Sequence, residues 1–69
     1  MSEQTPARAE VSVDTQRNLY RVEVFVGEQC VASRVAHDLT ELKQIGEDFA
    51  PLNATGLQEL IENIISQAN

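Results

Sequence analysis

From Ala9 to Asp14 apolar and polar side chains alternate, a period of two that is typical of a half-buried strand, and two further strand-like segments follow before His37. The segments begin at Ala9, Leu19 and Cys30, and the middle one is rich in the β-branched and aromatic side chains that strands favour. Turn-forming residues separate the segments, with Gly27-Glu28 before the third. The pattern therefore predicts a three-stranded antiparallel meander.

The loop before the third strand leaves the pairing of the last two strands open. A two-residue loop, Gly27-Glu28, pairs Val24 with Val31 and suits a type II′ turn, in which Gly is favoured at the first position. A four-residue loop from Gly27 to Cys30 keeps the same faces together. A three-residue loop is the least favoured, because it would turn the whole third strand over. Both favoured loops leave one mixed apolar and charged face, made of Leu19, Arg21, Glu23, Phe25, Cys30, Ala32, Arg34 and Ala36.

After His37 the apolar period changes to 3.6, which indicates an amphipathic helix. The segment Asp38-Leu39-Thr40-Glu41 has the form of a capping box, in which Asp38 accepts from the Glu41 amide and the Glu41 side chain reaches back. Gly46 weakens this helix by about 1 kcal/mol relative to Ala and is expected to permit close approach of a strand or a second helix. Pro51 ends the helix by restricting the residue before it. The apolar face consists of Leu39, Leu42, Ile45 and Phe49.

A second helix is predicted to begin at Thr55, where Thr55-Gly56-Leu57-Gln58 repeats the capping-box pattern. Its apolar side chains recur at helical spacing and form a stripe wide enough for both the core and a partner. The stripe consists of Leu57, Leu60, Ile61, Ile64 and Ile65. The predicted fold class is thus α+β: a three-stranded antiparallel β-meander followed by two α-helices packed on one face. This order excludes a βαβ nucleotide-binding unit, because it offers no parallel crossover.

Composition limits the domain organisation and the cellular location that we expect for this chain. The chain has 69 residues with a formal charge of −6 and one cysteine, so an internal disulfide is excluded. We expect a disordered leader over residues 1–8 and a single small domain over residues 9–69. No apolar run approaches the roughly 18 residues of a membrane span, and the first residues do not resemble a secretory signal. These features predict a cytoplasmic protein without membrane contact.

Candidate catalytic groups are few. Cys30 and His37 are the single members of their residue types, so a thiolate–imidazole pair would need both, and a four-ligand zinc site would need two chains. The three glycines are isolated, which disfavours a phosphate-binding loop. The five cations are scattered and the three aromatics fit the sheet or core, so direct nucleic-acid binding is also disfavoured. We therefore expect no catalytic residue, no cofactor and no metal.

The remaining features favour contact with another protein. The mixed face of the sheet is too apolar for full solvation and too charged for a core, and it presents Phe25. A core of this size rarely supplies more than about 3–5 kcal/mol, and oligomerisation is a common remedy. The leading hypothesis is a non-enzymatic protein–protein interaction protein, homo-oligomeric with a dimer favoured, that presents this face and the helical stripe to a partner whose identity the sequence does not give.

The charge distribution supports an alternative. Residues 38–69 contain six acidic residues and one lysine, a net charge of −5, whereas residues 1–37 contain five acidic residues and four arginines, a net charge of −1. A small acidic inhibitor, of the phage or mobile-element type, could dock on the basic nucleic-acid-binding surface of a partner protein. The candidate contacts are Glu47, Asp48, Glu59 and Glu62.

Overall fold

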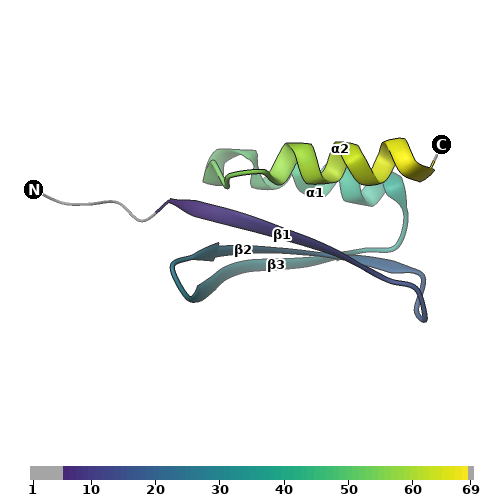
Figure 1. Ribbon diagram of the computed structural model, residues 1–69, viewed down its shortest axis with the longest axis horizontal. Helices are drawn as coiled ribbons and strands as arrows, with labels where there is room; N and C mark the ends of the chain where they lie inside the picture. Colours follow the sequence, from purple (N-terminus) through teal and green to yellow (C-terminus); the bar gives the residue numbers. More distant parts are fainter. Residues whose placement is uncertain (1–5, 69) are drawn as a thin grey trace, which may run out of the picture.

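The computed structural model describes residues 6–68 as two layers, a sheet and a pair of helices on one of its faces (Figure 1). The antiparallel strands lie in the order β1-β2-β3, with bounds β1 Ala7–Asp14, β2 Leu19–Val26 and β3 Gln29–Ala36. The helical elements are α1 Leu39–Phe49, the short 3-10 helix η1 Ala50–Leu52, and α2 Leu57–Ala68. Helix α1 contacts β3 and α2 contacts β1, and Figure 1 shows the opposite face of the sheet uncovered. The predicted α+β meander is confirmed.

Strand β1 begins earlier than predicted. Residues 1–5 of the expected leader lie outside the described residues, but Ala7 and Arg8 already belong to the strand. A parallel bridge holds this end: the Thr55 amide donates to the Ala7 carbonyl at 2.8 Å, and the Ala9 amide donates to the Thr55 carbonyl at 3.3 Å. The start of β1 is therefore fixed by a segment nearly fifty residues away in sequence, which local periodicity does not reveal.

The core lies between the two layers and is apolar throughout. Val22 and Val24 of the central strand are fully buried. Close contact between the helices depends on Gly46, because a Cβ there would lie 2.8 Å from Ile61 Cδ1. The predicted close approach at Gly46 is confirmed, and the neighbour is the second helix. The buried residues are Ala9, Val22, Val24, Ala36, Leu42, Ile45, Phe49, Leu57 and Ile61.

The turn between β2 and β3 is the two-residue loop. Val26 pairs with Gln29, which leaves Gly27-Glu28 between the strands. Gly27 has φ +62°, and Glu28 is not among the residues with positive φ. That combination is the one a type II′ turn requires. The loop length and the turn type agree with the prediction of a two-residue loop, one of the two that were favoured.

A β-bulge follows the turn and changes the register beyond it. Phe25 pairs with Cys30, but the preceding residue Val24 pairs with Ala32, so Val31 is an extra residue in β3. An extra residue exchanges the two faces of the strand beyond it. Beyond the bulge, β3 therefore has the orientation that a three-residue loop would give. That loop was the least favoured of the three predictions.

The predicted sharing of a valine face by β2 and β3 is therefore wrong. Ala32, Arg34 and Ala36 lie on the helix-covered side, opposite Val24, Val22 and Tyr20 of β2. Small side chains suit this position because α1 packs directly on β3, and Ala36 is fully buried there. The mixed face consequently contains the valines of β3 in place of its alanines.

Helix α1 has the predicted boundaries. The Asp38 carboxylate accepts from the Glu41 amide at 2.8 Å, which confirms the cap. Glu41 reaches back one residue further than expected, because its Oε1 accepts from the His37 amide at 2.7 Å. The helix ends at Phe49, but the predicted cause is wrong, because Ala50 keeps a helical conformation (φ −53°, ψ −41°) before Pro51 and the chain continues as η1.

Helix α2 begins at Leu57, and the capping box predicted there does not form. The backbone of Thr55 pairs with β1. The Gln58 side chain crosses to α1 and donates from Nε2 to the Gly46 carbonyl at 2.9 Å. Contacts between elements that are distant in sequence therefore replace the local pattern at this helix start.

Candidate functional site

The uncovered face of the sheet, hereafter the open face, is built from alternate residues of three strands. Cross-strand pairing arranges these residues in rows, and the bulge residue Val31 lies beside the first row. The rows are Arg8–Phe25–Cys30, Glu10–Glu23–Ser33, Ser12–Arg21–Val35 and Asp14–Leu19.

The apolar part of the open face is accessible. Val31 and Val35 are 52% and 42% exposed, and Phe25 and Leu19 are half-buried. Phe25 holds the position predicted for it as a candidate contact, on the face away from the helices. The predicted register placed these two valines on the helix-covered side, and the bulge brings them to the open face instead. The sequence has no specific signal for the bulge. Cys30, Val31 and Ala32 are three consecutive apolar residues, but so are Val24, Phe25 and Val26, which pair regularly with β1.

The open face contains a pair of like charges that is only partly compensated. Glu10 and Glu23 lie directly opposite each other on β1 and β2. Like charges in such a pair destabilise the sheet by a few tenths of a kcal/mol. Arg8 compensates in part, since it forms an ion pair with Glu10 and its guanidinium carbon lies 4.7 Å from the centre of the Phe25 ring. The second carboxylate, Glu23, lies between Glu10 and Ser33 and would gain from an added cation.

Most of the helical stripe packs against the core of the molecule. Leu57 and Ile61 are 2% and 3% exposed, so a partner cannot reach them in this fold. Leu60, Ile64 and Ile65 are half-buried and pack against the core. The stripe therefore keeps only partial access along one side of α2.

The four acidic candidates are exposed, two on each helix. Glu47 and Asp48 are adjacent on α1, so their side chains diverge by about 100°. The Asp48 carboxylate accepts from Gln44 Nε2 at 3.2 Å. Glu59 and Glu62 follow one another on a shared side of α2. The structure thus shows an acidic outer layer whose charges point in several directions.

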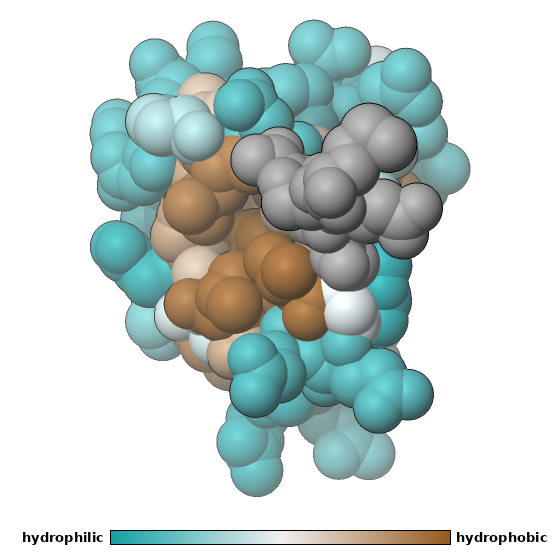
Figure 2. Space-filling view, turned by 90° about the vertical axis from the view of Figure 1, so that its left-hand side faces the viewer, coloured by the Kyte–Doolittle hydropathy of each residue, from teal (hydrophilic) through white to brown (hydrophobic). Residues whose placement is uncertain are grey.

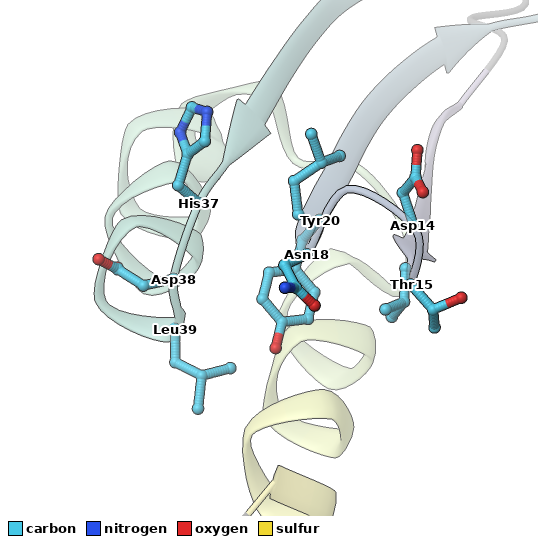
Figure 3. A pocket seen from close by; sticks show the side chains of 9 residues that line it. Asp14, Thr15, Asn18, Tyr20, His37, Asp38 and Leu39 are labelled. Atoms are coloured by element: carbon cyan, nitrogen blue, oxygen red, sulfur yellow. The ribbon is translucent and has the colours of Figure 1, made fainter.

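A hollow of about 360 Å³ lies where the β1–β2 turn meets the start of α1. The Asp14 carboxylate there accepts from the amides of Gln16 and Arg17, each at 3.1 Å. His37 Nδ1 lies 3.1 Å from Glu41 Oε1. Figure 3 shows the side chains of His37 and Asp38 pointing away from those of Tyr20 and Asp14. The polar groups around this hollow stabilise the turn and the helix start and do not converge on a common point.

The other chemical candidates are dispersed. Cys30 and His37 lie at opposite ends of β3, roughly 20 Å apart at the usual rise of a strand. One chain therefore does not bring the thiol to the imidazole. Within residues 6–68 no three His, Cys, Asp or Glu side chains gather as metal ligands would.

Apolar side chains also gather at the end of the molecule where η1 and the β2–β3 turn lie (Figure 2). Val26 and Leu52, which belong to β2 and η1, are 37% and 43% exposed. Val26 shares the helix-covered side of the sheet with Val24, so this end is separate from the open face.

Neither helix of the described part reaches the length and apolarity that a bilayer crossing requires. Comparison of the chain with protein-family models, with curated proteins and with solved structures finds no match in any of the three.

Proposed function

We propose that this protein is a non-enzymatic interaction domain that contacts another protein through its open face. The observation that carries the proposal is the exposure of Val31, next to the row of Phe25, and of Val35, next to Arg21, on a sheet face that the described helices leave uncovered. The polar row Glu10–Glu23–Ser33 separates the apolar group around Phe25 from the one around Val35, and exposed apolar groups rimmed by polar residues are typical of protein-binding sites. Both helices pack on the opposite face, so a macromolecule can approach this one without displacing them.

The proposal is further supported by the state of the polar side chains. The carboxylates of Asp14 and Asp38 accept hydrogen bonds from backbone amides and stabilise local structure. A catalytic site would need a nucleophile or base oriented by a second group beside a concave surface.

We place the interaction in the cytoplasm, where the exposed thiol of Cys30 would stay reduced.

Site-specific photo-cross-linking tests the proposal. A photoreactive side chain at Val35 is expected to capture a protein in cells that produce this chain, because the position faces the contact. The matched control is Val13, a valine of similar exposure (51%) on the helix-covered side of the sheet. Equal adducts from both positions, or adducts from Val13 alone, would contradict the proposal.

A second candidate function uses the other side of the molecule. All four acidic candidates are exposed, and Lys43 is the single cation among residues 38–69. An acidic inhibitor that occupies a basic groove would use these carboxylates, and its binding would weaken with salt. The test is a variant with Glu47→Gln, Asp48→Asn, Glu59→Gln and Glu62→Gln together. If this variant no longer binds a basic partner protein while it still forms the adduct at Val35, the result would favour the second candidate.

A further inference from the structure

We infer that the occupant of the open face is a second copy of this chain, turned end for end about a two-fold axis that lies between the two sheets and passes over β2 at Val22. This inference rests on the proposed function and names its partner. It is carried by the order of charges along the central strand. On the open face β2 presents Leu19, Arg21, Glu23 and Phe25, which read apolar, positive, negative, apolar.

This order is self-complementary in one orientation. A two-fold axis perpendicular to the strands reverses β2 against its copy, so Arg21 faces Glu23 of the second chain and Leu19 faces Phe25. Two-fold symmetry forms each contact twice, because residue i meets j and j meets i. The Glu23 carboxylate, which lies opposite Glu10 within its own chain, thereby gains a cation.

The other face-to-face orientation is disfavoured by the same charges. An axis parallel to the strands would place Arg21 on Arg21 and Glu23 on Glu23. Like charges brought together across a contact oppose association and exclude that arrangement. The charge pattern of β2 therefore selects the direction as well as the partner.

The outer strands are compatible with the selected orientation. On β1 the reversal sets Arg8 over Asp14 and Glu10 over Ser12, and no two like charges face each other. On β3 it sets Ser33 over Val35, so the valine is covered by a small side chain. Sheets packed face to face lie about 10 Å apart with strands within about 30° of each other. The central pairs of β2 keep their partners under such a rotation.

The contact is small, since it involves one face of three strands. We expect a dimer that dissociates on dilution from about 1 mM to about 10 µM, in the range of weak interfaces. Higher salt should weaken it, because exposed ion pairs at its centre are screened.

Sedimentation equilibrium of the full chain tests the inference with three forms. Arg21→Glu and Glu23→Arg each place two like-charge pairs at the centre, so each is expected to weaken self-association at least tenfold. The double variant Arg21→Glu/Glu23→Arg restores opposite charges in the same orientation and should associate within about threefold of the unmodified chain. An equimolar mixture of the two single variants should form a mixed dimer, because each supplies what the other lacks.

Net charge serves as the internal control. Arg21→Glu makes the acidic chain more negative, whereas Glu23→Arg makes it less negative, so a general charge effect would move the two variants in opposite directions. Lys43→Glu changes the net charge as Arg21→Glu does but lies on α1, and it should leave self-association nearly unchanged. Circular dichroism checks that each variant is folded.

The outcomes separate this inference from the proposed function. A dimer that both single variants leave intact would overturn the two-fold arrangement. A chain that stays monomeric up to about 1 mM, while the cross-linker at Val35 captures a different protein, would overturn the inference and leave the proposed function standing. A monomeric chain that also gives no Val35 adduct would overturn both.

Discussion

The Cδ1 atom of Ile61 on α2 occupies the space that a side chain at Gly46 on α1 would need, since a Cβ there would lie only 2.8 Å from it. Ile61 is 3% exposed, so it has little room to move away. Alanine at position 46 gains about 1 kcal/mol in helix propensity, but overpacking of a core costs about 1–3 kcal/mol. We expect Gly46→Ala to lower the free energy of unfolding by about 1 kcal/mol in urea denaturation.

The matched background for that change is Ile61→Val, which removes the Cδ1 atom. In this background Gly46→Ala should be neutral or stabilising, because the clash is gone and the propensity gain remains. Equal destabilisation in both backgrounds would contradict the contact described between the helices.

The register of β3 predicts a sharp difference between two neighbouring positions. Ala36 is fully buried under α1, so Ala36→Lys should lower the free energy of unfolding by about 3 kcal/mol or more, since it buries an unpaired charge. Val35 is 42% exposed on the open face, and Val35→Lys should cost less than about 1 kcal/mol. Thermal and urea unfolding of the two variants at low concentration measure this. The reverse ranking would mean that β3 lacks the bulge.

Removal of the Asp38 side chain tests the start of α1. The carboxylate accepts from the Glu41 amide at 2.8 Å, and loss of such a cap costs about 1 kcal/mol. Asp38→Ala should therefore lower stability by that amount in urea denaturation, while Asp38→Asn should retain most of it. If Asp38→Asn is as unstable as Asp38→Ala, the side chain does not act as the cap.

Glu23 offers a test in which stability and association move in opposite directions. Glu23→Gln removes the repulsion with Glu10 and should stabilise the monomer by a few tenths of a kcal/mol. The same change removes the charge that faces Arg21 of the second copy, so it should weaken self-association. Urea denaturation of dilute protein and sedimentation at high concentration measure the two effects. Glu28→Gln, in the exposed β2–β3 turn, is the control and should change neither.

The features that follow local rules were predictable from the sequence. Period-two and period-3.6 patterns identified the strands and helices, Asp38 identified the start of α1, and Pro51 marked its end. The open face was also predicted on β2, where Arg21 and Glu23 alternate with valines and Phe25 lies on the side away from the helices.

The differences arise where distant segments decide the structure. The bulge at Val31 places Ala32 and Ala36 on the side that α1 covers, and the first residues of β1 pair with Thr55. Val13 keeps the helix-covered side that alternation gives it, but it is 51% exposed at the end of the sheet next to the β1–β2 turn. At the start of β1 a contact between segments far apart in sequence extends the strand beyond the residues that local alternation marks.

Contact between two copies of this chain through the open face can be measured at the residues themselves. The most direct measurement is the NMR relaxation of valine methyl groups caused by a soluble paramagnetic probe, recorded as the protein concentration rises. If two copies meet through this face, Val31 and Val35 lose their exposure to the probe while Val13, similarly accessible in the monomer, keeps it. Unchanged exposure of Val31 and Val35, or protection of Val13 in their place, would rule out this contact.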